Sequence, residues 1–137
     1  MELDLHVHSD ASFDCDTTPA EIIERALDAG LGGIAVADHD SMDNLETLQE
    51  LAAGRLLVIP AIEVGTLFGD VVGYFAKKRV KRNIPEEGQD VDDLKIVLKA
   101  LKGQGALLSL PHPTRGQLAT LIETGLWREF DLVEAYN

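Results

Sequence analysis

Several features are scarce in this chain of 137 residues. It has a single cysteine, Cys15, which excludes an internal disulfide and makes a reducing, cytoplasmic compartment the expectation. No hydrophobic run approaches the roughly 18–20 residues that a membrane span requires, and the N-terminus lacks the pattern of a signal peptide. Phe, Trp and Tyr make up only 5% of the chain, so we expect a core of aliphatic residues. Without a long hydrophobic run, and with an excess of acidic residues, we expect no membrane partner.

Positive charge is also scarce. Twelve Lys and Arg stand against twenty-four Asp and Glu, which gives a formal net charge of −12 at pH 7. Such a field repels polyanions and therefore disfavours long nucleic acid as a partner. Two explanations of the acidic excess stay open at this point: a solvated acidic surface, or carboxylates that are gathered to hold cations.

Short apolar segments alternate with segments of helical periodicity. We expect six strands: Leu3–Val7, Gly33–Ala37, Leu56–Ile62, Val71–Phe75, Ala106–Leu110 and Leu132–Ala135. We expect four helices: after the N-terminal caps Thr18 and Ser41, from near Asp92, and over Gln117–Thr124. This alternation predicts a parallel α/β fold in a single domain over residues 1–137.

One long irregular stretch, Lys77–Gln89, holds five of the twelve basic residues. A loop of this length is often a lid or a binding loop, which would here supply positive charge to an anionic substrate. The other interpretation is a solvated excursion without a role in binding.

Residues that bind metals follow the predicted strands. In barrels of parallel strands the active site lies at the C-terminal strand ends, where the loops converge. Five predicted strands end in such residues: His6 and His8, Asp38 to Asp40, Glu63, His112 and Glu134. Solvated charges without a function would not keep this position so consistently.

The pair His6 and His8 has a specific geometry. Residues two apart in a strand point to the same side, so the two imidazoles can bind one metal ion. Alone, the pair is explained equally well as structural histidines. Together with His39, Glu63 and His112 it favours a metal site, since an unpaired carboxylate after an apolar run is costly and a glutamate can bridge two cations.

The carboxylates on either side of His39 have more than one interpretation. Asp38 and Asp40 are candidates for metal ligands or for the carboxylate that orients a metal-bound imidazole. For Asp40, capping of the following helix together with Ser41 is an equally good explanation.

These motifs resemble those of the PHP (polymerase and histidinol phosphatase) superfamily of metal-dependent phosphoesterases. Five segments carry the resemblance, in the order of the family: Asp4–Ser9, Ala37–Asp40, Ile62–Val64, Leu110–Pro113 and Val133–Asn137. The resemblance implies a distorted, TIM-like (β/α)7 barrel with two or three divalent metal ions at its strand ends. It also implies hydrolysis of a small phosphomonoester or a nucleotide-type phosphodiester by attack of a metal-bridging hydroxide.

The resemblance also implies the site residues. The expected metal ligands are His6, His8, Asp14, His39, Glu63, Asp70 and His112. The expected catalytic residues are Glu63, Asp38 and His39. Asp14 and Asp70 stand where family members have histidine, which shifts the ligand set toward oxygen and leaves Mn, Zn and Fe as candidate metals.

Two further residues are candidates for substrate binding. Arg115 follows His112 by three residues, and its guanidinium matches the geometry of a phosphate, although a surface arginine explains it equally well. Asn137 lies in the last motif, where a contact with the substrate is expected.

One motif of the family has no counterpart here. The Gly-Ser-Asp-Ala-His-like motif, whose Asp and His complete the metal site, is absent from the 137 residues. Six predicted strands are also fewer than seven, so we expect a barrel that is C-terminally incomplete and self-association through its exposed edge. The alternative function is therefore a non-catalytic or remnant PHP metal-binding module. A metal-free scaffold is disfavoured, because all four histidines lie at predicted strand ends.

Overall fold

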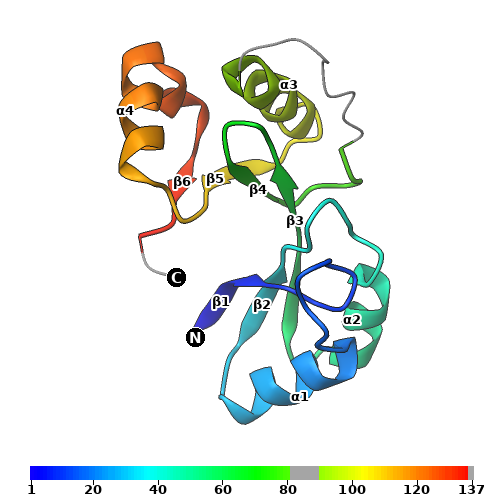
Figure 1. Ribbon diagram of the computed structural model, residues 1–137. Helices are drawn as coiled ribbons and strands as arrows, with labels where there is room; N and C mark the ends of the chain where they lie inside the picture. The colour runs from blue at the N-terminus through cyan, green and yellow to red at the C-terminus, as the bar shows by residue number, and fades with distance from the viewer. Residues whose placement is uncertain (81–89, 136–137) are drawn as a thin grey trace. The chain divides into compact units, whose positions relative to one another are not determined.

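The computed structural model describes residues 1–80 and 90–135. The chain divides into two compact units, Met1–Glu63 and Val64–Asn137 (Figure 1). The basic stretch Lys77–Gln89 lies outside the described residues from position 81 on, so both interpretations of it stay open. None of the described helices combines the length and the apolar character that crossing a membrane requires.

The first unit contains a parallel sheet in the order β1, β2, β3. Strand β2 pairs in register with β3, so that Gly33 lies opposite Leu57 and Val36 opposite Pro60. The predicted positions of these strands are confirmed: β1 has the predicted bounds, β2 ends one residue earlier, and β3 starts one residue later and ends three residues later. The elements of this unit are β1 (Leu3–Val7), α1 (Pro19–Asp28), β2 (Gly33–Val36), α2 (Leu45–Ala52) and β3 (Leu57–Gly65).

Helix α1 begins where the sequence predicts. The hydroxyl of Thr18 accepts a hydrogen bond from the backbone N–H of Glu21, and the Glu21 carboxylate accepts one from the N–H of Thr18 at 2.9 Å. Pro19 occupies the first turn, where its missing N–H costs nothing. This capping box satisfies two backbone donors and fixes the direction in which the helix leaves the loop after β1.

Helix α2 begins later than predicted. Its first residue is Leu45, so Asp40 and Ser41 lie too early in the chain to cap it, and that prediction is wrong. The hydroxyl of Ser41 instead accepts a hydrogen bond from the N–H of Asp43 at 3.2 Å, within the turn before the helix. The prediction failed because a serine hydroxyl can accept a backbone N–H in a tight turn just as it can at the start of a helix.

Both helices of the first unit pack against the sheet through one aliphatic core. Leu48 and Ile34 are 0% and 1% exposed, and full burial of such a side chain contributes about 1.5–3 kcal/mol. The expected aliphatic core is thus present in this unit. Its buried members are Ile22, Ile23, Ala26, Ile34, Val36, Leu48, Ala52, Leu56 and Val58.

The second unit contains strands of both directions. Strand β4 pairs antiparallel with β5, and β5 pairs parallel with β6, so the prediction of a purely parallel sheet is wrong. The turn at Thr66 and Gly69 joins β4 to the preceding strand, with paired backbone hydrogen bonds of 3.0 and 3.2 Å between these two residues. A parallel crossover needs a dozen or more residues, so this short connection must reverse the chain. The elements are β4 (Asp70–Tyr74), α3 (Asp90–Lys102), β5 (Leu107–Leu110), α4 (Arg115–Thr124), η1 (Leu126–Glu129) and β6 (Leu132–Val133).

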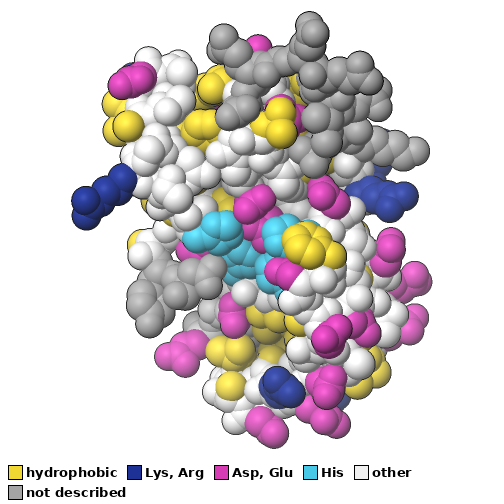
Figure 2. Space-filling view, viewed as in Figure 1, with side chains coloured by type: hydrophobic (Ala, Val, Ile, Leu, Met, Phe, Trp, Pro, Cys, Tyr) yellow, Lys and Arg dark blue, Asp and Glu magenta, His cyan; other side chains and the backbone are white. Residues whose placement is uncertain are grey.

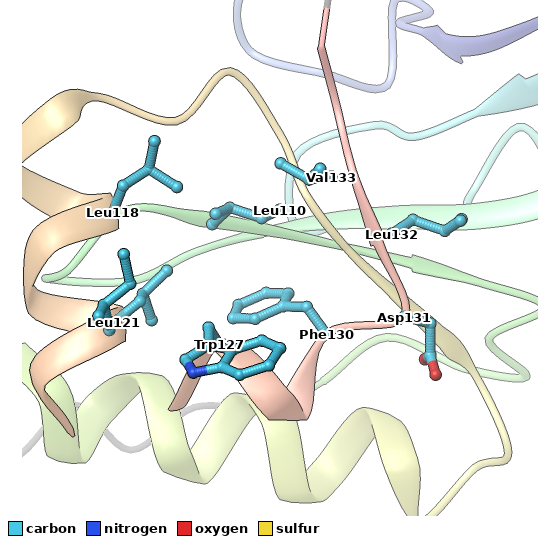
Figure 3. Close-up of a pocket in the computed structure, with 9 residues that line it drawn as sticks. Leu110, Leu118, Leu121, Trp127, Phe130, Asp131, Leu132 and Val133 are labelled. Carbon is cyan, nitrogen blue, oxygen red and sulfur yellow. The ribbon is translucent and has the colours of Figure 1, made fainter. Parts of the chain in front are cut away.

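Helix α4 and the short helix η1 of the second unit border an apolar groove of about 280 Å³. Trp127 and Phe130 point their rings into it beside Leu118 and Leu121 of α4 (Figure 3). Helix α4 starts at Arg115, two residues before its predicted start, because Thr114 and Gln117 form a second capping box. Two of the six Phe, Trp and Tyr residues of the second unit thus line this groove.

Candidate metal centre

The ends of the three parallel strands bring four predicted site residues together. The ladder between β2 and β3 continues beyond β2 through a bridge between His39 and Glu63. In this bridge the N–H of Asp40 donates to the carbonyl of Glu63 at 2.8 Å, and the N–H of Glu63 donates to the carbonyl of Asp38 at 3.2 Å. These backbone contacts hold the side chains of His39 and Glu63 beside each other.

Three imidazoles converge on one carboxylate oxygen. The Oε2 atom of Glu63 lies 2.9 Å from Nε2 of His6, 3.2 Å from Nε2 of His8 and 3.6 Å from Nε2 of His39. The Nε2 atoms of His6 and His8 are 3.0 Å apart, as expected for residues on the same side of a strand. We call His6, His8, His39 and Glu63 the imidazole–carboxylate cluster. Histidine and acidic side chains gather on the face seen in Figure 2.

The carboxylate at the centre of the cluster is held in its charged form. Glu63 is 1% exposed, and this burial on its own raises the pKa of its carboxyl group. Hydrogen bonds from His6 and His8, together with the positive charge of His6 and His39, outweigh the burial and hold the pKa well below its usual range. Glu63 is therefore an anion at neutral pH, buried among groups that can share a cation.

The cluster fits a divalent metal ion. One donor atom each from His8, His39 and Glu63 lies within 4.8 Å of the others, which is close enough to coordinate a single ion. Imidazole nitrogen and carboxylate oxygen together suit zinc, manganese and iron. The Nε2 atoms of His6 and His8, 3.0 Å apart, are also close enough for both rings to bind one ion. The chemistry of the donors thus supports the predicted metal binding.

The loop after β1 holds the ring of His8 and the backbone of His39. The hydroxyl of Ser12 contacts Nδ1 of His8 at 3.1 Å, accepts the N–H of His39 at 3.1 Å and donates to Asp14 at 2.6 Å. A partner of this kind on the second ring nitrogen sets the orientation of an imidazole that binds metal through the first. Ser12 was missed by the sequence analysis, because nothing in its local sequence distinguishes it from any other loop serine.

Asp14 lies at the exposed side of the cluster. Its carboxylate is 3.7 Å from Nδ1 of His8 and 3.5 Å from Nε2 of His39. The hydrogen bond from Ser12 and the nearby His8 and His39 lower the pKa of Asp14, although partial burial opposes this. The predicted ligand Asp14 is therefore within reach of the cluster, and its role as a ligand stays a prediction.

Asp38 faces the loop and not the cluster. It is 2% exposed, and its carboxylate accepts hydrogen bonds from the N–H of Ser9 and from the Ser9 hydroxyl at 2.6 Å. Asn44 donates to the same hydroxyl at 2.9 Å, which ties the start of α2 to this loop. With these contacts Asp38 positions the loop that carries Ser12. Its predicted catalytic role has no support from its contacts and stays a prediction.

The other predicted site residues belong to the second unit or to the part that is not described. Asp70 opens β4 and is half-buried, and Arg115 is the exposed first residue of α4. His112 has a φ of 28°, which is rare outside glycine, and its N–H donates to Glu134 at 2.9 Å. Asn137 lies outside the described residues. None of these is a member of the cluster defined above, and their roles stay predictions.

The PHP domain family matches residues 4–110, a range that includes the whole imidazole–carboxylate cluster. The chain belongs to the PHP family. An uncharacterized protein of Methanocaldococcus jannaschii is 30% identical over 113 residues, which cover 82% of this chain and 40% of that protein. The resemblance found in the sequence motifs is thereby confirmed.

Solved structures share the fold. A two-domain protein from Bacteroides vulgatus, which contains a predicted PHP-like metal-dependent phosphoesterase, has a TM-score of 0.69 at 21% identity. The similar region covers 97% of this chain and 43% of the Bacteroides vulgatus protein. An amidohydrolase from Chromobacterium violaceum has a TM-score of 0.74 at 16% identity, covering 97% of this chain and 76% of the other. The predicted α/β fold of the PHP type is confirmed, whereas the assignment of residues 1–137 to one domain stays a prediction.

Proposed function

We propose that this PHP protein is a metal-dependent phosphoesterase that hydrolyses a small phosphorylated substrate. The observation that carries the proposal is the convergence of three imidazoles on the buried carboxylate of Glu63. Membership of the PHP family and the likeness to a protein that contains a predicted phosphoesterase support it. The chain spans about two fifths of the length of the Bacteroides vulgatus protein and of the Methanocaldococcus jannaschii protein. The activity of those longer proteins is therefore attributed to this chain only as a proposal.

The residues of the imidazole–carboxylate cluster are proposed to have different roles in binding metal. Divalent ions bound at this site would activate a water molecule and stabilise the charge that develops on the phosphate. Glu63 supplies a permanent negative charge at the buried end of the cluster. Ser12 contacts the ring of His8 and accepts the backbone N–H of His39, and this pre-arrangement reduces the entropy lost when an ion binds. We expect two or three ions of manganese, zinc or iron.

The charge of the protein favours a small substrate. A net charge of −12 repels a long polyanion, whereas one phosphate group is attracted by the ions that the cluster holds. A phosphomonoester or a nucleotide-type phosphodiester fits this condition. Arg115 and Asn137 are proposed to contact the substrate, as the motifs predict.

The test is phosphate release from a panel of phosphate esters, with metal content measured on the same protein. We expect release that requires Mn²⁺ or Zn²⁺, stops with a chelator and is lost in Glu63→Gln. The control is Glu50→Gln, the same chemical change on the exposed side of α2, which should retain the activity.

Two results would contradict the proposal in different ways. Full metal content without turnover of any ester would favour the non-catalytic metal-binding module. A protein that takes up no metal would exclude both the enzyme and the metal-binding module. Including simple amides in the panel covers the reaction class named for the relative from Chromobacterium violaceum.

A further inference from the structure

One aromatic side chain of the first unit lies outside its core. Phe13 is the only Phe, Trp or Tyr among residues 1–63, and its side chain is 87% exposed. The core of this unit is built from aliphatic side chains alone, so the ring of Phe13 contributes nothing to it. Exposure of one apolar side chain is common and by itself carries no meaning. The position of this one is what gives it significance.

Phe13 lies directly on the cluster. Its ring stacks on the imidazole of His39, with the ring centroids 4.8 Å apart and the planes 29° from parallel. Its neighbours in the chain, Ser12 and Asp14, both contact cluster histidines, so the backbone on either side of the ring is tied to the cluster. One part of the ring therefore covers His39, and the rest is open at the edge of the metal centre.

The charges around this ring determine what can bind to it. The first unit contains only two basic residues, Arg25 and Arg55. Arg55 donates to the carbonyl of Leu51, and Arg25 lies in the last turn of α1. Apart from bound metal ions, attraction for the uncharged part of a substrate must come from groups without charge. An open aromatic face next to the cluster can supply it, because a planar ring stacks favourably whatever the local field.

We propose that Phe13 is a specificity-determining residue that stacks on a planar aromatic base of the substrate while the cluster receives its phosphate. The substrate class is then a nucleotide, and not an aliphatic phosphate ester. This inference rests on the proposed phosphoesterase function, since it assigns the phosphate to the cluster. No covalent step involves Phe13.

The experiment compares two ligands that differ only in the base. Binding of the 5′-methylenephosphonate analogues of adenosine 5′-monophosphate and of ribose 5-phosphate, which cannot be hydrolysed, is measured by calorimetry on the full chain with Zn²⁺ present. Stacking on one aromatic side chain strengthens binding by roughly tenfold, so we expect that preference for the nucleotide in the wild type. In Phe13→Leu, which keeps an apolar side chain, the preference should fall below about twofold, and in Phe13→Tyr it should be retained.

A spectroscopic readout separates stacking from a change in folding. The adenine H2 and H8 resonances should move upfield on binding to the wild type and to Phe13→Tyr, but not on binding to Phe13→Leu. Leu51→Ala, which truncates another exposed apolar side chain of the first unit, should retain both the shift and the preference. Circular dichroism of each variant verifies that it is folded.

The outcomes distinguish this inference from the proposed function. Equal affinity of the wild type for both ligands, an unchanged preference in Phe13→Leu, or no binding of the nucleotide would overturn the role of Phe13. Phosphate release is assayed separately. Its absence from a protein that retains the preference for the base would contradict the phosphoesterase and leave the stacking site supported.

Discussion

The two units of the chain differ in charge and in aromatic content. Residues 1–63 contain fourteen Asp and Glu against Arg25 and Arg55, and so carry the full net charge of −12. Residues 64–137 contain ten acidic and ten basic residues and are neutral. Six of the seven Phe, Trp and Tyr lie in this neutral half. The acidic excess is thus confined to the unit that contains the imidazole–carboxylate cluster.

This difference bears on the origin of the negative charge. If the charge only kept the surface solvated, it would not need to be confined to one half of the chain. A negative field around the cluster instead raises the local concentration of cations and speeds their binding. The second unit has no such field, and its described surface offers an apolar groove beside α4 and η1. The comparison favours metal binding as a property of the first unit.

The largest expected effect comes from removing the central carboxylate. Glu63→Gln removes the buried anion on which three imidazoles converge, and metal affinity should fall more than about 100-fold, beyond the loss typical of an outer partner. Calorimetric titration with Zn²⁺ measures this. Glu123→Gln makes the same change on an exposed position of α4 in the neutral unit and should leave the affinity unchanged. An equal loss of metal affinity in both variants would contradict the assignment of metal binding to the first unit.

Metal should stabilise the first unit selectively. At a free concentration 100 times the dissociation constant, a ligand that binds only the native state adds about 2.7 kcal/mol to the free energy of unfolding. We expect a rise in the melting temperature with Mn²⁺ or Zn²⁺, which a chelator reverses. Hydrogen exchange should slow mostly in β1 to β3 and their loops. An equal slowing in α3 and α4 would show that the stabilisation is not local.

A smaller loss of metal affinity is expected from removing the Ser12 hydroxyl, which contacts the His8 ring and the His39 backbone. Ser12→Ala removes contacts to His8, His39 and Asp14 but no proposed direct ligand of a metal, so the affinity should fall about tenfold. The control in the neutral unit is Thr120→Ala, whose hydroxyl donates to the carbonyl of Gly116 within α4. Full affinity in Ser12→Ala would show that the histidines are oriented without this loop.

The smallest expected effect is on the free energy of unfolding, from a feature that both units have. Both have a helix that begins with a capping box, at Thr18 in the first unit and at Thr114 in the second. Thr18→Ala and Thr114→Ala should each lower the free energy of unfolding by about 1 kcal/mol, measured by urea denaturation. Neither should alter the affinity for metal by more than about twofold, because no cap hydroxyl contacts a cluster residue. A metal defect in Thr18→Ala alone would mean that α1 positions the cluster.

Much of the metal centre could be predicted from the sequence. His6 and His8 lie at the end of the first predicted strand, and His39 and Glu63 at the ends of the next two. Parallel strands bring such positions to one edge of a sheet. The strand pattern therefore predicts that these side chains meet, although they are up to 57 positions apart in the sequence. The strand positions and the cap at Thr18 were also predictable, because local sequence determines them.

Other features depend on contacts that local sequence does not contain. The late start of α2 follows from the turn at Ser41, and the fixed loop follows from the bonds of Ser9 to Asp38 and Asn44. The antiparallel strand β4 had a signal, because no helical segment separates it from the strand before. Phe13 had none, since only the structure brings its ring onto His39.

We infer that a metal ion in the first unit is bound by imidazoles and by Glu63. X-ray absorption at the zinc edge, on protein loaded with one equivalent of Zn²⁺, measures the ligands directly. We predict several imidazole ligands and only nitrogen or oxygen neighbours at about 2.0–2.2 Å, with the imidazole signal reduced in His6→Ala and His8→Ala. A sulfur neighbour at about 2.3 Å, which would assign the site to Cys15, or a spectrum without imidazole would contradict it.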